Sequence, residues 1–356
     1  SHVVFNAPSD EELRKKIYYL FLYKNYLSYS QNFTFKKLFN ALYNSYEYKL
    51  KRVKMNSFPS AYGIDIGNFC NLKCPLCPTG TNCPDRKKKF MFFEDYKKVF
   101  DKIKKYAFVV NLYNWGEPFL NKDIFKIIEY TKKNKVGVLL STNLNHLTDE
   151  MIDKIIKLKL DKMVISLDGA SQETYGVYRK GGDFNKVLEN LKKIIKKKKE
   201  LNSNYPRIVW QYLISKKNEK DIDKAKKISD ELGIRINFLY MRTSQLIRRK
   251  GWKLNKKIVE EWVSKDFEGT AEEASSTINL RGVCIYPFKY LFVNPEATTS
   301  PCCALYDEKT DFGNLLDNDL KEVWNNKKYV SARSNFSKNK LKGKVFTICD
   351  ICDSVS

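Results

Sequence analysis

Three cysteines directly after an apolar run constrain the chemistry of this chain more than any other feature. Cys70, Cys74 and Cys77 have the spacing C-x3-C-x2-C within the segment NFCNLKCPLCPTG. Three thiolates are one short of a closed tetrahedral zinc site and one short of the four that a [4Fe–4S] cluster takes, one per iron. We therefore expect a [4Fe–4S] cluster with one open iron, where a small molecule can bind and be reduced.

Length and composition indicate a globular protein of about two domains. The chain has 356 residues, of which 43% are hydrophobic, and domains usually take about 100–200 residues. It shows no secretory signal and no run of about 18 uncharged apolar residues that could cross a bilayer. The nine cysteines cluster at metal-ligand spacings rather than as a disulfide framework. We expect a reducing, cytoplasmic location.

The large positive charge admits two interpretations. Lys and Arg number 65 against 41 acidic residues, which gives a formal charge of +24. Such a charge favours an anionic partner, whether nucleic acid, a phosphorylated metabolite or a lipid head group. Abundant Lys, Asn, Ile, Tyr and Phe are equally what a biased genome gives any protein. The chain has two histidines, and His146 is expected in a loop before a helix. Acid–base or nucleophilic catalysis by histidine is therefore not favoured.

Residues 62–240 alternate between short apolar runs and amphipathic segments. Such alternation predicts a parallel sheet with right-handed crossovers. Six strands are too few for a closed eight-stranded barrel, so we expect an α/β fold with a partial (β/α)6 TIM-like barrel over residues 61–245. Ligands of parallel α/β folds collect at the carboxyl ends of strands, where the cysteine loop begins. The predicted strands are YGIDI from Tyr62, FVVNLY from Phe108, VGVLLS from Val136, KMVISL from Lys162, RIVWQYLI from Arg207 and IRINFLY from Ile234.

Residues 1–60 differ from the barrel and are expected to form an N-terminal helical extension. A capping box at residues 9–12 precedes a Tyr-, Leu- and Phe-rich helix. We expect the apolar face of a second helix, from Thr34, to pack against the barrel; the alternative is a membrane surface or an amphiphilic substrate. No pattern of a peptide-leader-binding domain is present. The second helix carries Phe35, Leu38, Phe39, Leu42 and Tyr46 on one face and Lys36, Lys37, Asn40 and Asn44 on the other.

Four further motifs follow successive predicted strands. They are GEP at 116–118, STN at 141–143, SLDG at 166–169 and YRKGG at 178–182. With the cysteine loop, they resemble the radical S-adenosylmethionine superfamily over about residues 62–240. The resemblance implies that the open iron chelates the amino and carboxylate groups of S-adenosylmethionine. One electron then yields methionine and a 5′-deoxyadenosyl radical, which removes hydrogen from an unactivated carbon.

The same resemblance implies roles for individual residues. The three cysteines would ligate the cluster. The guanidinium of Arg179 suits the carboxylate of S-adenosylmethionine, because its fork of N–H groups matches the two oxygens. One departure is Trp115, which stands where the family often has the first glycine of Gly-Gly-Glu-Pro. The implied assignments are Gly116 and Glu117 for the methionine amino group, Ser141 and Asn143 for the ribose or carboxylate, and Ser166 with Arg179 for the carboxylate.

The last quarter of the chain holds five more cysteines and is expected to be a separate iron–sulfur domain over residues 283–356, after a helical connector at 246–282. This segment contains FVNPEATTSPCC, GNLLDNDLKEVW, Arg333 and a C-x2-C loop. On these features it resembles the SPASM or twitch extension of radical S-adenosylmethionine enzymes. This resemblance implies one auxiliary [4Fe–4S] cluster; the alternative is a four-thiolate zinc site. The implied ligands are Cys284, Cys302, Cys349 and Cys352, with Cys303 spare.

These features predict an oxidoreductase. A cluster with four protein ligands has no open iron for substrate, so it would relay electrons and favour oxidation or bond formation. An external low-potential donor such as flavodoxin or ferredoxin would supply the electron. Cys83 is either a hydrogen donor, as in some epimerases, or an ordinary loop residue.

The substrate stays open at this stage. An anionic lipid or isoprenoid chain is mildly favoured by the basic, aromatic N-terminus, which also suggests a peripheral membrane contact; a sugar or a peptide are the alternatives. The non-enzymatic alternative is a zinc-bearing nucleic-acid-binding protein, with salt-dependent binding. It accounts for the charge but not for the series of motifs at strand ends.

Overall fold

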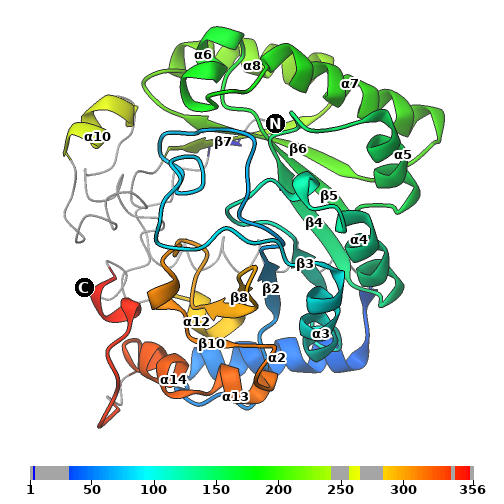
Figure 1. Ribbon diagram of the computed structural model, residues 1–356. Helices are drawn as coiled ribbons and strands as arrows, with labels where there is room; N and C mark the ends of the chain where they lie inside the picture. The colour runs from blue at the N-terminus through cyan, green and yellow to red at the C-terminus, as the bar shows by residue number, and fades with distance from the viewer. Residues whose placement is uncertain (1–2, 5–31, 242–255, 265–283, 338–340, 353–356) are drawn as a thin grey trace.

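The computed structural model describes residues 3–4, 32–241, 256–264, 284–337 and 341–352, and its centre is one sheet (Figure 1). The strand order in this sheet is β1-β7-β6-β5-β4-β3-β2-β8-β9-β10. The strands are β1 Val3–Val4, β2 Ala61–Ile64, β3 Val109–Asn111, β4 Gly137–Thr142, β5 Lys162–Ser166, β6 Arg207–Ile214, β7 Arg235–Tyr240, β8 Tyr290–Val293, β9 Thr298–Ser300 and β10 Gly313–Asn314.

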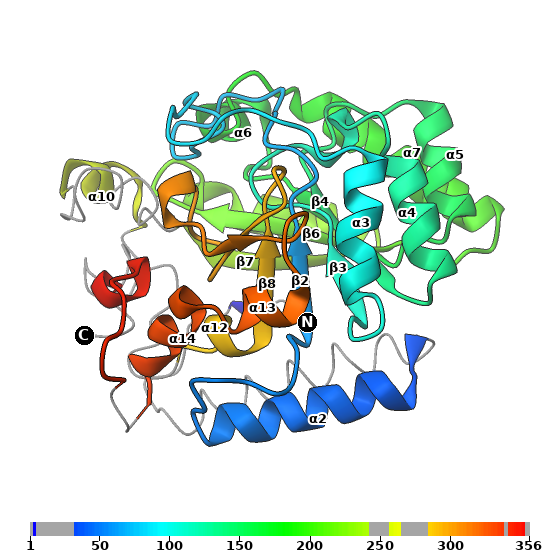
Figure 2. The same ribbon diagram turned by 60° about the horizontal axis from the view of Figure 1, so that its bottom comes forward.

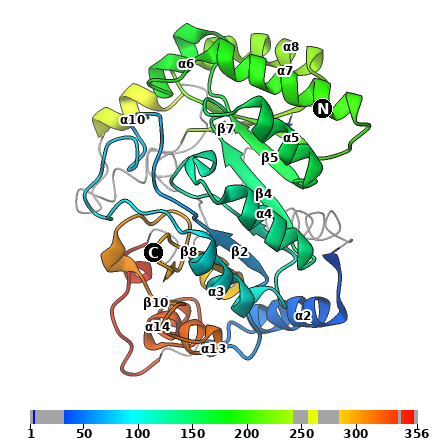
Figure 3. The ribbon, with the colours of Figure 1, turned by 45° about the vertical axis from the view of Figure 1, so that its right-hand side comes forward.

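The six predicted barrel strands are confirmed as β2 to β7. Each pairs in parallel with the next one along the chain. The connecting helices lie along the outer face of the curved sheet, as Figures 1 and 3 show for α4, α5, α7 and α8. The partial barrel is therefore the observed architecture. The barrel helices are α3 Phe93–Ile103, η2 Pro118–Leu120, α4 Ile124–Lys133, α5 Asp149–Lys157, α6 Gln172–Tyr178, α7 Phe184–Glu200, η3 Glu219–Asp221 and α8 Ile222–Glu231.

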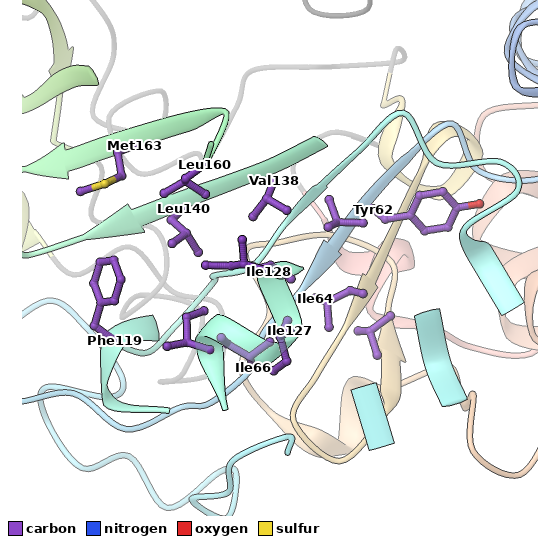
Figure 4. Close-up of a cluster of buried hydrophobic side chains, with 14 of the residues drawn as sticks. Tyr62, Ile64, Ile66, Phe119, Ile127, Ile128, Val138, Leu140, Leu160 and Met163 are labelled. Atoms are coloured by element: carbon purple, nitrogen blue, oxygen red, sulfur yellow. The ribbon is translucent and has the colours of Figure 1, made fainter. Parts of the chain in front are cut away.

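The main core lies between this sheet and the outer helices. Val138 and Leu140 of β4 are fully buried against α4, which contributes Ile127 and Ile128 (Figure 4). Side chains alternate between the two faces of a strand, so the residues between them point to the inner face of the barrel. That inner face carries the functional groups considered below.

The C-terminal segment is joined to the barrel through the sheet itself. β8 pairs in parallel with β2 at four positions, and the antiparallel strands β9 and β10 continue the sheet beyond it. At the opposite edge, β1 pairs with β7, which the expectation of a purely helical N-terminal extension missed. The remaining helices are α10 Lys256–Trp262, α12 Tyr286–Lys289, η4 Glu308–Thr310, α13 Leu320–Trp324, α14 Lys327–Ser334 and η5 Ile348–Ile351.

The second predicted helix exists, but it faces the other way from our expectation. It is α2, Phe35–Lys49, with the side chain of Thr34 as its N-cap. Phe35 is 84% exposed, Phe39 71% and Leu42 61%. Lys37 and Asn44, by contrast, are buried. The expectation that the apolar face packs against the barrel is wrong. The capping box at residues 9–12 and most of the connector at 246–282 lie outside the described residues.

Hydrogen bonds to the backbone explain this inversion. Asn44 Nδ2 donates to the carbonyl of Phe288 at 2.8 Å, and Lys37 Nζ donates to the carbonyl of Lys135 at 2.6 Å. The carboxylate of Glu47 accepts from the backbone N–H of Ser57 at 2.8 Å and from its hydroxyl at 2.6 Å. Buried backbone groups of a connecting segment require partners, and the polar face of α2 supplies them.

These contacts place α2 across the amino ends of the barrel strands. Lys135 lies just before β4, Phe288 lies just before β8, and Phe58, whose backbone bonds with Asn40, lies just before β2. Figure 2 shows α2 at the opposite end of the molecule from the loop that follows β2. The exposed apolar face of α2 therefore does not line the cysteine site.

Substitutions on the two faces of α2 test this orientation. Asn44→Leu should lower the free energy of unfolding by about 1–3 kcal/mol. The reason is that the carbonyl of Phe288 and the hydroxyl of Ser57 both lose the donor that Asn44 Nδ2 provides. Leu42→Ser should change it by less than about 0.5 kcal/mol, since Leu42 is already in solvent. Chemical denaturation measures both. A stabilised Asn44→Leu variant would show that the apolar face is the packed one.

Candidate functional site

The cysteine loop lies at the carboxyl end of β2, over residues 65–92. Its backbone is fixed to the turn after α6, since the N–H of Lys73 donates to the carbonyl of Lys180 at 2.8 Å. Burial first, and then the nearby charges of Glu117, Cys74 and Cys77, raise the pKa of Cys70 to about 12. The three thiols therefore lie within electrostatic reach of one another. Buried thiolates so close together require a compensating positive charge, which cluster iron would supply.

Gly116 and Glu117 lie directly against this loop. A Cβ on Gly116 would stand 1.8 Å from the carbonyl oxygen of Gly67, so only glycine fits there. The next N–H, of Glu117, donates to the carbonyl of Phe69 at 2.7 Å. The GEP motif is thus a close backbone contact between the end of β3 and the cysteine loop, beyond any role toward a ligand.

The Glu117 carboxylate is almost fully buried. It accepts hydrogen bonds from the Thr142 hydroxyl at 2.8 Å, the backbone N–H of Asn143 at 2.8 Å and that of Phe119 at 3.2 Å. Burial nevertheless raises its pKa to about 7. A carboxylate held this way is poised to accept a further donor with positive charge.

Asn143, Ser141 and Ser166 converge on the same place from β4 and β5. Asn143 Nδ2 donates to Asn71 Oδ1 at 2.9 Å and lies 3.7 Å from the sulfur of Cys70. The hydroxyls of Ser141 and Ser166 are 3.2 Å apart, on the inner face of the sheet. The structure thus brings the motif residues of successive strand ends together around the cysteine loop.

Arg179 is bound by a partner that the sequence-based assignment left out. Its Nε and Nη2 both lie 2.6 Å from one carboxylate oxygen of the fully buried Asp168. Its Nη1 lies 3.9 Å from the sulfur of Cys74. The fork is therefore occupied by Asp168, and the edge that carries Nη1 faces the cluster ligands. The signal was present, since Asp168 is the third residue of the SLDG motif.

Two further predicted residues are Cys83, which lies beside the cysteine loop's Cys77, and His146 in the segment after β4. Cys83 is buried in a small cluster with Trp115 and Tyr306, and Cys77 packs against that cluster. His146 is exposed in a bend before α5, as expected.

Trp115 and Asp65 were not recognised as site residues. The N–H of Trp115 donates to Asp65 Oδ2 at 3.0 Å, and its indole Nε1 donates to the carbonyl of Leu305 at 3.0 Å. Burial raises the pKa of Asp65 to about 7. The tryptophan that replaces a family glycine therefore connects the barrel to the C-terminal segment.

Arg86 makes a second such connection. This buried side chain donates through Nε to the carbonyl of Tyr306 at 2.8 Å, and it pairs with Asp311 at 2.7 Å and Glu296 at 2.9 Å. Buried and charge-assisted pairs of this kind are geometrically specific. The cysteine loop and the C-terminal segment are thus held in a fixed relation.

The C-terminal cysteines form a second group. Burial raises the pKa of Cys284 to about 12, with Cys352 and Cys303 among its charged neighbours. The pKa of Cys349 is also raised, by burial first and then by Cys284, Cys302 and Cys352. Cys303 Sγ lies 3.8 Å from the Tyr286 hydroxyl. The four expected ligands are therefore neighbours, and Cys303 lies near Cys284 as well.

Neither group is drawn tightly around one point. Within the described ranges, no three side chains of His, Cys, Asp or Glu stand close enough to hold a single metal ion. The grouping of the cysteines rests on their shared loops and mutual electrostatic influence.

Comparison with known protein families supports both halves of this arrangement. The profile of the radical SAM superfamily matches residues 64–208, and that of SPASM, an iron–sulfur cluster-binding domain, matches residues 284–353. The chain is a radical SAM protein with a SPASM domain. Such domains hold a [4Fe–4S] cluster with S-adenosylmethionine and auxiliary iron–sulfur clusters, respectively, and the two cysteine groups provide the thiolates that these cofactors require.

Curated relatives match about half of the chain. The AdoMet-dependent heme synthase of Methanosarcina barkeri is 25% identical over 182 residues, which are 51% of this chain and 50% of the relative. Mycofactocin maturase MftC of Mycolicibacterium smegmatis is 25% identical over 179 residues, 49% of this chain and 43% of the relative. The chain thus spans about half the length of these relatives.

A solved structure extends the likeness of fold. SuiB of Streptococcus suis, bound to S-adenosylmethionine, is 17% identical, with a TM-score of 0.60 over 84% of this chain and 72% of SuiB. The fold of the radical SAM protein is thereby confirmed across both the barrel and the C-terminal segment.

The Gly116 contact gives a direct test of the site. Gly116→Ala should displace the cysteine loop, because its methyl group overlaps the carbonyl of Gly67, and should destabilise the fold by about 3 kcal/mol or more. Iron content after anaerobic reconstitution and the unfolding midpoint measure this. Gly176→Ala is the control, since its methyl group meets only the end of the Gln172 side chain, at 3.1 Å. Normal iron content in both variants would contradict the contact.

Proposed function

We propose that this radical SAM protein is an oxidoreductase that removes hydrogen from an unactivated carbon of an anionic substrate. One observation carries the proposal. The side chains of Glu117, Asn143 and Arg179, from the segments after β3 and β4 and from the end of α6, all converge on the thiols of the cysteine loop. When bound, the cluster and S-adenosylmethionine supply one electron and a 5′-deoxyadenosyl radical, which takes a hydrogen atom from the substrate.

Cys70, Cys74 and Cys77 would hold the cluster, and the surrounding residues would orient S-adenosylmethionine. The Gly116 carbonyl and the Glu117 carboxylate would accept from its ammonium group. Glu117 and Asp168 are two buried acids against one buried base, Arg179. A ligand with both an ammonium and a sulfonium charge would balance this excess of negative charge.

The remaining motif residues would receive the rest of the ligand. Nη1 of Arg179 and the Ser166 hydroxyl are placed to meet the carboxylate, and Ser141 and Asn143 the ribose or the carboxylate. Because Arg179 keeps its Asp168 partner, we infer that it acts through one edge of the guanidinium rather than through the full fork.

The second group would hold one auxiliary [4Fe–4S] cluster on Cys284, Cys302, Cys349 and Cys352, with Cys303 outside the ligand set. Four thiolates would complete this cluster and leave it to supply one-electron redox capacity. An external donor such as flavodoxin or ferredoxin would deliver the electron for the first cluster. These features favour dehydrogenation or bond formation over epimerisation with Cys83 as hydrogen donor, since Cys83 packs beside Trp115 and Tyr306.

The substrate is the finer part of the proposal. An anionic lipid or isoprenoid chain is less favoured than before, because the aromatic face of α2 lies at the opposite end from the site. The names of relatives point elsewhere: MftC is a maturase, and SuiB has been solved with its precursor peptide SuiA. A sugar or peptide with an anionic group fits the barrel interior better.

We propose a separate role for α2, as a contact with an anionic membrane surface. Its exposed face presents Phe35, Phe39 and Leu42, and the flanking Lys36 and Lys49 are exposed as well. Glu47, the one acidic residue between positions 32 and 56, is buried beneath the helix. An apolar stripe without exposed acids suits anionic lipid head groups. No helix among the described residues is long and apolar enough to span a bilayer.

Cofactor content and cleavage of S-adenosylmethionine test the enzymatic proposal. Anaerobically reconstituted protein should hold about eight irons per chain, four in each cubane. Replacing Cys70, Cys74 and Cys77 with Ala should remove about four irons and abolish formation of 5′-deoxyadenosine. Replacing Cys284, Cys302, Cys349 and Cys352 should remove the other four. Reduced, fully loaded protein that yields no 5′-deoxyadenosine would refute the proposal.

Vesicle flotation tests the role of α2. The protein should float with vesicles that contain phosphatidylglycerol, less so with neutral phosphatidylcholine, and less at high salt. The triple variant Phe35→Ser, Phe39→Ser, Leu42→Ser should lose this binding. Phe92→Ser, which changes a 42% exposed aromatic residue outside α2, is the matched control. Equal flotation of both variants, or none of the native chain, would refute the membrane contact.

A further inference from the structure

The inner wall of the barrel is polar and basic over strands β5 to β7. On β6 the side chains of Trp210 and Tyr212 are buried in the core with the outer helices. Residues of the other parity, Arg207 and Gln211, therefore project to the inner face. The same alternation puts Arg235 on the inner face of β7. This is the face on which Ser166 meets Ser141.

The strand register aligns these inner residues in rows. Ser166 lies opposite Gln211, which lies opposite Asn237 on β7. Four residues earlier along β5, Lys162 lies opposite Arg207. Neighbouring strands are about 4.8 Å apart and rise about 3.3 Å per residue, so the lower row lies about 13 Å below Ser166.

Three cations lie near one another at the amino end of this wall, where Arg207 and Arg235 are exposed and Lys162 is partly buried. The pKa of Lys162 is lowered by that burial and by the like charges of Arg207 and Arg235. Arg235 of β7 lies opposite Val209, which is two residues after Arg207 on β6. Its Nε donates to Asn237 Oδ1 at 2.9 Å, which directs the guanidinium along the strand toward the carboxyl ends.

At two of these three positions, Lys162 and Arg235, no ion pair among the described residues offsets the positive charge. In the parts of the chain that the structure describes, neither Lys162 nor Arg235 has a carboxylate within salt-bridge distance. Like charges forced together raise the free energy of the folded state unless an anion joins them. Such an arrangement on an inner wall is typical of a site for an anion.

Hydrophobic residues close the wall above the polar rows. Leu213 is the next inner residue of β6 after Gln211, and it packs with Met241 and Trp262 of α10. The polar row of Ser166, Gln211 and Asn237 is therefore bounded above by an apolar cluster and below by Val164 and Val209, beyond which lie Lys162 and Arg207. A ligand along the wall would meet amide groups beside Ser166 and positive charge at its far end.

We propose that Lys162, Arg207 and Arg235 bind an oxyanionic group, phosphate or carboxylate, at the far end of an extended substrate. This inference rests on the proposed function, since it places the reacting carbon near Ser141 and Ser166 and the anion about 13 Å away. Gln211 and Asn237, level with Ser166, would hydrogen-bond polar groups beside the reacting carbon, and the apolar pair Val164 and Val209 would line the stretch between the two ends.

Binding of simple anions tests the site without any radical chemistry. Isothermal titration of the full, cluster-loaded chain with inorganic pyrophosphate, and separately with glutarate, at fixed salt measures the affinity. The substitutions Lys162→Gln, Arg207→Gln and Arg235→Gln should each weaken binding by about tenfold, since each removes a charge-assisted contact. Lys186→Gln and Lys192→Gln remove equal charge from exposed positions on α7 and should leave the affinity unchanged.

The outcomes separate the two proposals. A preference for pyrophosphate assigns a phosphorylated substrate and a preference for glutarate a carboxylated one, and either supports the site. No binding, or equal loss in the α7 variants, refutes it and attributes any attraction to the overall charge of +24. Neither anion takes part in cleavage of S-adenosylmethionine, so failure of that cleavage refutes the proposed function and not the anion site.

Discussion

The close approach of two backbones, at Gly116 and Gly67, is the constraint on which the site depends. With no side chain between them, the end of β3 reaches the cysteine loop, and the Glu117 N–H bonds the Phe69 carbonyl. From the other side, the Lys180 carbonyl holds the N–H of Lys73. The three thiols are therefore positioned by strand ends that are themselves fixed in a parallel sheet. A loop held this way needs little rearrangement to receive a cluster.

Burial of charge is the second theme of the site, and it recurs between the domains. Asp168 and Arg179 pair beside Cys74, while Arg86 pairs with Asp311 and Glu296 across the junction with the SPASM domain. Removing one partner of such a pair leaves an uncompensated buried charge, which is far costlier than the pair itself. The two cysteine groups are thus held at a defined separation by contacts that tolerate little change.

Much of this arrangement could be predicted from the sequence, because period and spacing determine it. Six apolar runs gave the barrel strands, and motifs after them gave the residues that converge on the cysteines. The orientation of α2 could not be predicted. A helical period shows that two faces differ, but not which is packed; here the buried face is polar, since Asn44 and Glu47 satisfy backbone groups distant in the sequence. Arg86 and Trp115 were missed for the same reason, as their partners lie some two hundred residues further on.

The two ends of the barrel therefore serve different purposes. Its carboxyl end carries the thiols and the buried Glu117, whereas its amino end carries α2 with its apolar side in solvent. The inner wall between them changes from neutral amides near Ser166 to cations at Lys162. On the proposed anion site, a substrate whose anionic end reaches those cations would bind with its neutral part toward the cysteine loop. Charge along the wall would then select both the substrate and its direction, before any bond is broken.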